Sequence, residues 1–597
     1  MRSRRAQWLL PALFAAALGL LVAGQCLLGA SATAQSSGKP NVVLLLTDDQ
    51  TLEEMSGLPQ TSSLIGGRGT TFSRAYVSYP LCCPSRAAIL TGQYMHDNGV
   101  HGNSPPTGGW QRYDERGLEQ RDLPNWLRGA GYHNVQVGKY LNGYNGSLPP
   151  AWDEWYGKLS EYDPSVHGAR LYFNYRVRED PPEDGGVPCP SGDPPSPGEP
   201  FTCHYGQDTA DYQTDVLREM AVEAIHRLGD SSSGQTPFFL NVDFNAPHSP
   251  YVPAPRHQGS FAGLPITPPP GANEKNVSDK PFFLRRLPKL GNGKLIGIDN
   301  RRRSRLEMLR SLDDAVAAIV GALAAEGQLQ NTYLIFTSDN GYFSGEHRIR
   351  QGKYLPHEPS SHVPLLIRGP GIPAGGTSGE LVSNVDLAST IAQIAGATPQ
   401  LAQDGRSLLP YAANPSLRST RPILLEGDTG TNIDDEGAEG LSVQNLADFG
   451  RFQKRLRHQK KKLRRRCKRL KRKSPKRAIL CYRRGVRNIE QEPVDTVYKL
   501  QAPAYRGIRT DRYALHLYST GEVELYDMWR DPYQLKAVSK NRRYRGVRKW
   551  LLARLAQLAS CSGASCSAPL GAEPAPRKKK KKKRKAQQRR QQRSSAR

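Results

Sequence analysis

The sequence predicts an α/β protein, in which a sheet is flanked by helices, followed by a smaller α+β subdomain. Three short apolar runs rich in branched residues predict buried parallel strands, within residues 41–50, 236–251 and 331–341. Helical patterns such as residues 302–328, with apolar side chains every three or four positions, lie between these runs. Strands that alternate with helices are typical of α/β sheets, whose functional groups gather at the carboxyl ends of the strands.

The C-terminal part of the chain has a different composition. After about residue 425 a polar stretch leads into a basic run, and residues 505–535 then predict short antiparallel strands with a Thr-Gly turn. Residues 547–560 predict a closing helix. We therefore divide the chain into a signal segment (1–34), a main domain (38–425), a polar and strongly basic insertion (426–500), an α+β subdomain (501–566) and a disordered Lys/Arg-rich tail (567–597).

The first residues predict export. Three arginines precede an apolar stretch over residues 8–28, and Ala32-Thr33-Ala34 provides a small-residue cleavage site. The alternative is a retained membrane anchor, because the apolar run is long enough to begin spanning a bilayer. The predicted location is therefore secreted or associated with the cell envelope.

The cysteines fit an oxidising compartment. Of the nine, Cys26 leaves with the signal segment, and the spacing of the others suggests three local disulfides. The pairs are Cys189 with Cys203, Cys467 with Cys481, and Cys561 with Cys566. Cys82 and Cys83 remain unpaired, since neighbouring cysteines seldom bond to each other.

The positive charge is concentrated in two segments. Residues 451–478 contain 17 Lys or Arg, residues 577–597 contain 13 more, and neither segment has an Asp or Glu. Without them the rest of the chain carries 53 basic and 55 acidic residues, so the net charge of +28 lies in these attachments. In the first segment, leucines seven residues apart give a cationic helix one thin apolar seam, which is typical of polyanion or membrane-surface binding. A solvated insertion without a partner is the alternative, and we expect no specific nucleic-acid ligand.

Polar residues follow two of the predicted strands. Asp48 and Asp49 end the first strand, and Asp339 and Asn340 end the third. Gathered at one edge of a sheet, these oxygen ligands suit Ca²⁺ or Mg²⁺. Asp-Asp and Asp-Asn-Gly are also common turn formers, which is the alternative explanation.

The segment Cys82-Cys83-Pro84-Ser85-Arg86, followed by Ala-Ala-Ile-Leu-Thr-Gly, carries a family resemblance. It is similar to the Cys-x-Pro-Ser-Arg signature of sulfatases, in which the first cysteine is oxidised to formylglycine (3-oxoalanine) by a formylglycine-generating enzyme. The resemblance implies that hydrated formylglycine at Cys82 attacks the sulfur of a sulfate ester, and that reformation of the aldehyde releases sulfate. Cys83 would be a buried apolar filler.

The resemblance extends over most of residues 40–425. It implies an alkaline-phosphatase-like sandwich with a large mixed sheet, in which residues 38–425 are the catalytic domain. Gly-Lys-Tyr-Leu-Asn at residues 138–142 resembles extracellular heparan sulfate 6-O-endosulfatases and N-acetylglucosamine-6-sulfatases. Carried over by residue, the metal ligands would be Asp48, Asp49, Cys82 as formylglycine, Asp339 and Asn340. The sulfate would be surrounded by Arg86, Lys139, His248 and Lys353.

These roles agree with the charges that sulfate-ester cleavage develops. A metal ion, lysines and an arginine stabilise charge on the leaving oxygen, and His248 or a lysine would protonate the departing alcohol. Many arylsulfatases have a histidine two residues after the first lysine, where this chain has Leu141. His96, His101 and His347 are therefore candidates for the base that breaks down the intermediate.

We expect an exported sulfuric ester hydrolase that acts on 6-O-sulfated glucosamine units or related sulfated glycans. One alternative is a phosphodiester or phosphonate monoester hydrolase of the same superfamily. The other is a cationic protein that binds the cell envelope and has a vestigial hydrolase domain. The expected partners are a sulfated carbohydrate or aryl sulfate, the formylglycine-generating enzyme and an anionic polymer or envelope that contacts the basic segments.

Overall fold

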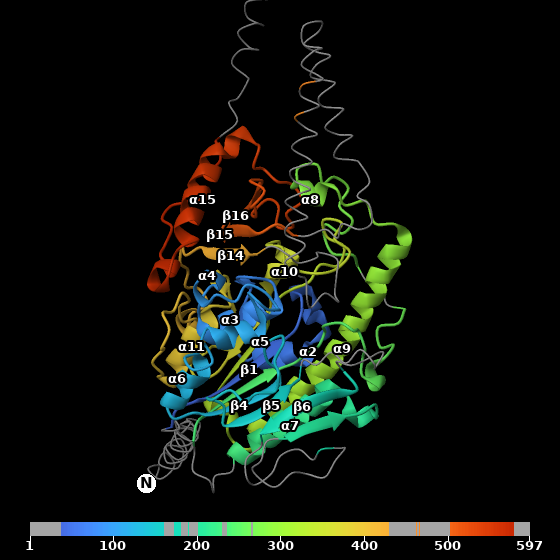
Figure 1. Ribbon diagram of the computed structural model, residues 1–597, viewed down its shortest axis with the longest axis vertical. Coiled ribbons are helices and arrows are strands. Elements are labelled where there is room, and N and C mark those ends of the chain that lie inside the picture. Colours follow the sequence, from blue (N-terminus) through green and yellow to red (C-terminus); the bar gives the residue numbers. More distant parts are fainter. Residues whose placement is uncertain are drawn as a thin grey trace, which may run out of the picture. The chain divides into compact units, whose positions relative to one another are not determined.

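The computed structural model describes residues 38–159, 172–180, 189, 201–229, 236–263, 265, 267–428, 461, 465 and 502–577 (Figure 1). The chain divides into the units Met1–Lys39 and Pro40–Arg597, and the fold below is that of the second unit. The predicted signal segment, nearly all of the basic insertion and the end of the tail lie outside the described residues. Among the helices that the structure describes, none combines the length and apolar composition needed to cross a bilayer.

The main sheet has a parallel centre, with antiparallel pairings on both sides of it. In the described part of the chain its ten strands follow the order β12 (Gly376–Ser378), β2 (Thr70–Phe72), β11 (Leu365–Arg368), β9 (Thr332–Ser338), β1 (Asn41–Thr47), β8 (Phe238–Asp243), β4 (His133–Lys139), β5 (Glu154–Lys158), β6 (Tyr175–Asp180) and β7 (Phe201–Tyr205). Strands β9, β1, β8, β4 and β5 run parallel to one another. The three predicted strands are β1, β8 and β9, neighbours at the centre, so the predicted mixed α/β sheet is confirmed.

Alternate residues of β1 pack against different helices. Val43 and Leu45 belong to the core that contains α7 (Gln213–Gly229) and α9 (Asn292–Ala325), whereas Leu44 belongs to the core on the opposite face. That second core contains residues of α3 (Cys82–Thr91), α6 (Leu123–Gly129) and α11 (Asp386–Ala395). Figure 1 shows these two sets of helices on opposite sides of the strands. A strand with two buried faces explains why the sequence at β1 is continuously apolar.

Short elements connect the layers. A small sheet has the order β10 (His362–Val363), β3 (Ala75–Tyr76) and β13 (Val382–Ser383). The short α-helices are α2 (Pro59–Thr61), α4 (Met95–Asn98), α5 (Gly109–Glu115), α8 (Phe282–Arg285), α10 (Glu358–Ser361) and α12 (Leu409–Ala413). The 3₁₀ and π segments are η1 (Leu52–Gly57), η2 (Ser62–Gly66), η3 (Thr209–Asp211), η5 (Pro255–His257), η6 (Leu329–Asn331), η7 (Arg542–Tyr544) and η8 (Gly563–Ser567).

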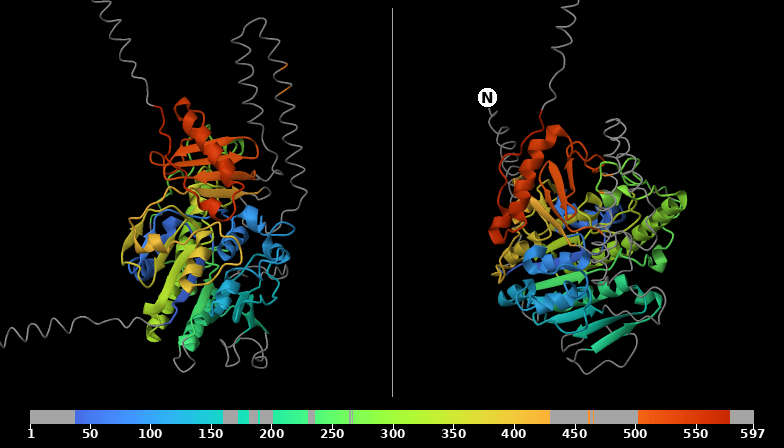
Figure 2. Two further views of the ribbon diagram at one scale, coloured as in Figure 1. Left: turned by 90° about the vertical axis from the view of Figure 1, so that its left-hand side faces the viewer. Right: turned by 45° about the horizontal axis from the view of Figure 1, so that its top comes forward.

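The C-terminal subdomain is an antiparallel sheet covered by one helix. Its strands are β14 (Ile423–Gly427), β15 (Tyr505–Arg509), β16 (Tyr513–Tyr518) and β17 (Val523–Asp527), and its helix is α15 (Arg545–Leu558). The turn between β16 and β17 includes Gly521, whose φ of +79° suits glycine. Strand β14 pairs with β15, so the sheet begins before the basic insertion. Figure 2 shows this sheet and α15 as a separate layer beside the main domain.

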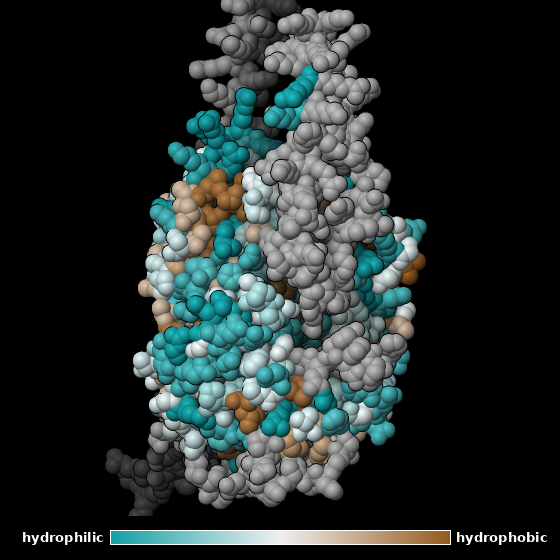
Figure 3. Space-filling view, viewed as in Figure 1, coloured by the Kyte–Doolittle hydropathy of each residue, from teal (hydrophilic) through white to brown (hydrophobic). Residues whose placement is uncertain are grey.

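Two of the predicted disulfides are confirmed. Cys189 is bonded to Cys203 and Cys561 to Cys566, whereas the predicted pair Cys467–Cys481 lies outside the described residues. Cys82 and Cys83 are buried free thiols, as predicted, and Cys83 lies in the core around α3. The face drawn in Figure 3 is mainly hydrophilic, with an apolar cluster where Figure 1 draws α15.

His96 of α4 connects the main domain to the C-terminal subdomain. Its Nδ1 lies 2.9 Å from Glu426 Oε2 on β14, and its Nε2 lies 2.8 Å from the carbonyl oxygen of Cys561. Burial alone would lower the pKa of His96, but the hydrogen bond and the charge of Glu426 raise it from 6.5 to about 9. The histidinium form therefore stabilises the folded chain.

The resulting stabilisation is complete below about pH 6.5 and is lost as the pH rises through about 9. After allowance for solvent screening we expect it to be about 1–2 kcal/mol. Thermal unfolding of the wild type and His96→Gln, measured at pH 6 and pH 9.5, should show a smaller pH dependence of Tm in the variant. The same substitution at His226, in an exposed pair with Glu326, is the control. Equal pH dependence in wild type and His96→Gln would contradict this role.

Candidate active site

The carboxyl ends of four parallel strands meet at one edge of the main sheet. Strands β9, β1, β8 and β4 are consecutive in the sheet, and Thr47 at the end of β1 is opposite Ser338 at the end of β9. The residues that follow each strand are thereby brought together. All nine predicted site residues lie at this edge: Asp48, Asp49, Cys82, Arg86, Lys139, His248, Asp339, Asn340 and Lys353.

The turn after β1 presents two adjacent carboxylates to the same region. Asp49 has a φ of +69°, in the left-handed region that non-glycine residues seldom adopt. This conformation interrupts the strand alternation that would otherwise direct neighbouring side chains to opposite faces. The backbone N–H of Asp49 donates to Asp339 Oδ1 at 3.2 Å, which ties the ends of β1 and β9 together.

Cys82 is the first residue of α3, and its side chain lies between a carboxylate and an ammonium group. Its Sγ is 3.4 Å from Asp48 Oδ1 and 2.8 Å from Lys353 Nζ. Pro84 occupies the first turn of α3, where its missing N–H is not needed, and Gly92 ends the helix at a φ of +68°. The sequence thus fixes Cys82 at a helix N-terminus, which favours negative charge.

The two lysines pair with the carboxylates of the β1 turn. Lys139 Nζ donates to Asp48 Oδ2, and Lys353 Nζ donates to Asp49 Oδ1. Lys139 ends β4 directly after Gly138, which has a φ of +96°. A Cβ at Gly138 would lie 2.2 Å from the carbonyl oxygen of Asp243, so glycine permits the close approach of β4 to β8.

The residues after β9 connect with α3. Arg86 Nε donates to Asp339 Oδ2 at 2.9 Å, and Arg86 Nη1 donates to the carbonyl oxygen of Lys139 at 2.9 Å. Asn340 Nδ2 donates to Asp49 Oδ1, which leaves the buried Asn340 Oδ1 without a hydrogen-bond partner among the described residues. An unpartnered buried oxygen beside three carboxylates is the environment that a hard cation satisfies.

His248 lies on the segment after β8, at the outer side of the cluster. Its Nε2 is 3.8 Å from Asp49 Oδ2, and its Nδ1 is 2.6 Å from the carbonyl oxygen of Ser249. A carbonyl oxygen only accepts, so Nδ1 donates this hydrogen bond, and Nε2 is the nitrogen that faces Asp49. The side chains of His248 and Lys139 are 17% and 13% exposed, compared with 7% for Lys353, so the first two are the most accessible to a ligand.

The charges of this cluster strongly influence one another. Burial alone would raise the pKa of the Asp48 carboxyl, but the surrounding positive charges, Lys139 first, lower it well below its ordinary value. The pKa of Asp339 is raised by burial and by the charge of Asp48. Burial, followed by Asp48, raises the pKa of the Cys82 thiol to about 12. The unmodified thiol is therefore neutral at physiological pH and is a weak nucleophile.

Part of the cluster has the spacing of a metal site. Asp48, Asp49, Cys82 and His248 each offer one ligand atom, and these atoms lie within 4.8 Å of one another. This group includes His248, which the sequence placed near the sulfate, and does not include Asp339. Asp339 instead accepts from Arg86 and from the backbone of Asp49.

Two residues that the sequence analysis missed also contact the site. Asp243 ends β8, and its Oδ1 lies 3.5 Å from Arg86 Nη1. Burial raises the pKa of Asp243 to about 6. Asp243 could have been predicted from the sequence, because it ends a predicted strand in the way that Asp48 follows one. Arg305, in the middle of α9, donates to Glu54 Oε1 at 2.6 Å and to the carbonyl oxygen of Asp49 at 2.7 Å, and no local pattern marks it.

Replacing Arg305 with methionine should strongly destabilise the chain. Arg305 is fully buried, and its loss would leave the carboxylate of Glu54 unpaired, which costs about 3–5 kcal/mol. Arg310→Met on the same helix is the control, because Arg310 forms a part-exposed pair with Asp313 at 3.8 Å. Thermal unfolding should show a much lower Tm for Arg305→Met than for Arg310→Met. Equal Tm values would show that the buried pair of Arg305 with Glu54 does not stabilise the chain.

The three candidate bases make contacts elsewhere. His96 contacts Glu426, His101 Nδ1 lies 3.0 Å from Asp428 Oδ2, and His347 Nδ1 lies 2.8 Å from Glu274 Oε2. None of these partners belongs to the strand-end cluster. Leu141, at the position of the missing histidine, is buried in the core around α3.

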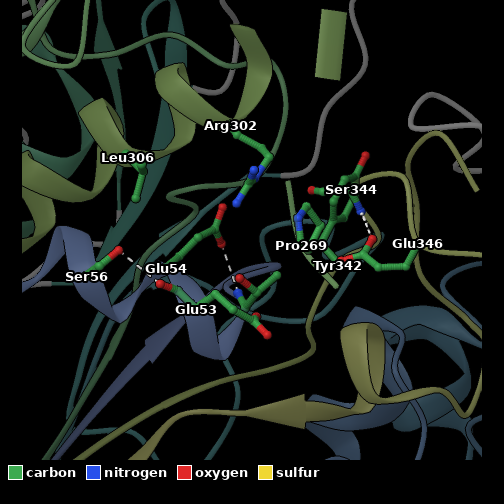
Figure 4. A pocket seen from close by; sticks show the side chains of 10 residues that line it. Glu53, Glu54, Ser56, Pro269, Arg302, Leu306, Tyr342, Ser344 and Glu346 are labelled. Carbon is green, nitrogen blue, oxygen red and sulfur yellow. Dashed lines mark hydrogen bonds between the residues drawn. The ribbon is translucent and has the colours of Figure 1, made fainter. Parts of the chain in front are cut away.

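A separate hollow lies beside η1 and α9 (Figure 4). It is lined by both acidic and basic side chains, among them Glu53, Glu54, Arg302 and Glu346, and by Tyr342. None of the nine predicted site residues lines it. Figure 4 shows Arg302 extending from α9 toward Glu54.

Comparisons with known proteins agree with this geometry. The family model described as Sulfatase matches residues 40–397. The chain is 37% identical over 448 residues to N-acetylglucosamine-6-sulfatase of Homo sapiens, covering 71% of this chain and 74% of that protein. It is 35% identical over 378 residues to the putative extracellular sulfatase Sulf-1 homolog of Caenorhabditis elegans, covering 62% of this chain. The match spans only 49% of the length of that relative.

A solved structure shows the same fold. It is a protein in complex with its substrate D-glucosamine-2-N,6-O-disulfate, with a TM-score of 0.62 and 20% sequence identity, covering 90% of this chain and all of that one. The likeness confirms the alkaline-phosphatase-like sandwich with its large mixed sheet and small C-terminal subdomain. Together with the family match over more than half of the chain, it confirms the resemblance first seen around Cys82. The chain belongs to the sulfatase family.

Proposed function

We propose that this protein is an exported, metal-dependent sulfatase that hydrolyses 6-O-sulfate esters of glucosamine-type sugars or related glycans. The substrate class is supported by the name of the human relative and by the ligand of the solved neighbour. Export is supported by the predicted signal segment and by the extracellular relative. The observation that carries the proposal is the position of Cys82 Sγ, which lies between Asp48 and Lys353 at the convergent strand ends.

The proposed metal ligands are Asp48, Asp49, Asp339, Asn340 and the modified Cys82. Their oxygen-rich composition and the unpartnered Asn340 Oδ1 fit Ca²⁺, with Mg²⁺ as the alternative. When bound, the metal would withdraw negative charge from the sulfate and favour attack at sulfur. The three carboxylates offset the charges of Arg86, Lys139 and Lys353, so a divalent cation would make the site positive and complementary to an anionic ester.

Formylglycine at residue 82, in its hydrated form, would supply the hydroxyl that attacks the ester sulfur. An oxygen of that side chain would stand where Cys82 Sγ is found, 2.8 Å from Lys353 Nζ. Lys353 would therefore donate a hydrogen bond to the nucleophile's oxygen and stabilise its charge. Arg86 holds Asp339 at 2.9 Å and thereby keeps the carboxylate cluster in place.

Lys139 and His248 are the groups best placed to assist the leaving alcohol. They are the more exposed of the basic side chains at this edge. His248 Nδ1 is held by the carbonyl of Ser249, so a proton on Nε2 would be available to the departing oxygen. This role makes the leaving group neutral as the sulfur–oxygen bond breaks.

Substrate comparison tests the proposal. Protein produced with a formylglycine-generating enzyme is assayed on glucosamine 6-sulfate saccharides, an aryl sulfate and an aryl phosphonate. We expect sulfate release from the 6-sulfated sugars and the aryl sulfate, with phosphonate hydrolysis at least about tenfold slower, because a site selects its ester by differential transition-state binding. Faster phosphonate hydrolysis would instead establish the phosphonate hydrolase alternative.

Deletion of the basic segments tests the alternative of an envelope-binding protein. We expect a chain without residues 429–500 and 578–597 to keep its turnover of a small aryl sulfate but to lose retention on an anionic polysaccharide column. The reason is that 30 Lys and Arg lie within 451–478 and 577–597 and nearly all would be removed. Retention of the intact chain should decrease as salt increases. Intact protein that binds the polymer but never releases sulfate would support the binding alternative.

A further inference from the structure

A cluster of buried histidines lies apart from the strand-end site. We define the histidine cluster as His347, His357, His516 and Glu524, each of which is at most 1% exposed. His347 and His357 flank Lys353 on the segment between β9 and α10. His516 on β16 is directly opposite Glu524 on β17 in the C-terminal sheet. The cluster therefore joins the segment that carries Lys353 to the subdomain, because His357 Nε2 lies 3.1 Å from Glu524 Oε2.

Three members of the cluster have the spacing of metal ligands. His357 Nε2 and His516 Nδ1 lie 3.1 and 3.5 Å from the same atom, Glu524 Oε2. One ligand atom from each of these residues lies within 4.8 Å of the others. Two ligands at about 2.0–2.1 Å from a tetrahedral zinc ion are about 3.3 Å apart, which the measured distances bracket.

The ring nitrogens are not accounted for by hydrogen bonds. Both nitrogens of His357, both of His516 and Nε2 of His347 have no hydrogen-bond partner among the described residues. The two nitrogens near Glu524 interact with the charge of its carboxylate, and the other nitrogen of each ring has no hydrogen-bond partner among the described residues. A buried, unpaired nitrogen is costly, and a shared cation would satisfy several of these lone pairs at once.

The surrounding groups support ligation. Tyr518 donates to Glu524 Oε2 at 2.7 Å, and Tyr526 donates to Glu524 Oε1, so the carboxylate is held in one orientation. His347 Nδ1 lies 2.8 Å from Glu274 Oε2, the carboxylate–histidine arrangement that orients metal-binding imidazoles. The buried Lys280 opposes a cation, but it lies 3.7 Å from Glu274, whose charge offsets it.

We propose that His357, His516 and Glu524 bind a zinc-type transition-metal ion. The ring of His347 packs beside them, with its centroid 4.9 Å from that of His357. Imidazole with carboxylate suits zinc, whereas the oxygen-rich strand-end site suits calcium or magnesium. The ion would be structural, because the cluster is closed and none of the nine strand-end site residues belongs to it. Its effect would be to fix the segment around Lys353 to the C-terminal sheet.

The test measures zinc bound to the full-length protein. Wild type and Cys82→Ala are stripped with a chelator, loaded with zinc chloride, gel-filtered and analysed by mass spectrometry of the metal. The Cys82→Ala background excludes zinc held by an unmodified thiol at the strand-end site. We expect about one zinc ion per chain in both proteins, as closed structural sites bind zinc tightly.

Variants in the Cys82→Ala background locate the ion. His516→Gln and Glu524→Gln should lose nearly all bound zinc, whereas His226→Gln, in an exposed pair with Glu326, should keep it. Cobalt loaded in place of zinc should give the visible bands of a four-coordinate ion in Cys82→Ala but not in the two ligand variants. Zinc should also raise the Tm of Cys82→Ala without raising theirs.

Either of two results would overturn the proposal. One is zinc far below one ion per chain in Cys82→Ala, and the other is unchanged zinc content in His516→Gln and Glu524→Gln. If those variants fail to fold, the zinc content and the cobalt spectrum of Cys82→Ala are compared with those of Cys82→Ala/His248→Gln, which also lacks the imidazole of the strand-end site. Zinc that is lost with His248 would overturn the proposal. The measurement is independent of sulfate hydrolysis, so its failure leaves the proposed enzymatic function untouched.

Discussion

Replacing Cys82 with alanine is expected to abolish sulfate-ester turnover. Cys82 Sγ is the proposed position of the nucleophile, 3.4 Å from Asp48 and 2.8 Å from Lys353, and alanine removes every group that could attack sulfur from there. Loss of an enzyme's nucleophile lowers kcat by about 10⁴-fold or more. Release of an aryl alcohol by protein matured with a formylglycine-generating enzyme measures the effect.

Two further variants make this prediction specific. Cys83→Ala is the matched control, because the Cys83 side chain lies in the core, and we expect it to lower stability slightly while turnover stays within about tenfold. Cys82→Ser keeps an oxygen but lacks an aldehyde hydrate, so it should accumulate a sulfated protein without turnover. Wild-type turnover in Cys82→Ala would show that the nucleophile lies elsewhere.

Asp339→Asn is expected to lower turnover by about 10²–10³-fold through weaker metal binding. Asp339 is fully buried, pairs with Arg86 at 2.9 Å and is a proposed metal ligand, so its neutralisation removes one of three negative charges around the cation. The wild type should lose activity with a chelator and regain it with Ca²⁺ or Mg²⁺. The variant should need a higher metal concentration for the same recovery.

Asp243→Asn provides the control for a general loss of charge. Asp243 is also buried at this edge and lies 3.5 Å from Arg86, but it is not among the proposed metal ligands. Its substitution should leave the metal concentration for half-maximal activity close to that of the wild type. An equal shift in Asp243→Asn and Asp339→Asn would mean that Asp339 does not hold the metal.

The central strands and their polar ends were predictable because the signal is local. The apolar runs that form β1, β8 and β9 are buried on both faces. β1 and β9 end directly before a polar pair, and β8 itself ends in Asp243. Convergence at one edge then follows from parallel pairing. Motif resemblance supplied Cys82, Arg86, Lys139 and Lys353, which lie where the strand ends meet.

Residues that act through long-range contacts were not predictable. Arg305 lies in an ordinary helical pattern, and only the tertiary fold places it against Glu54 and the backbone of Asp49. Likewise, His516 meets His357 across 159 positions of sequence, through a sheet packed on the main domain. The pairing of β14 with β15 across the basic insertion has the same origin. Amino-acid composition shows where one kind of segment gives way to another. It does not show which distant strand a given strand will pair with.

The mass of the peptide that contains Cys82 is the most direct test of formylglycine as the nucleophile. Protein produced with a formylglycine-generating enzyme is digested with trypsin. The mass of the peptide is then compared with that of the same peptide from unmodified protein. We expect a loss of about 18 Da, the exchange of a thiol for an aldehyde. An unmodified Cys82 that alkylates fully, in protein from an active maturation system, would contradict it, because the buried neutral thiol has no route to the proposed chemistry.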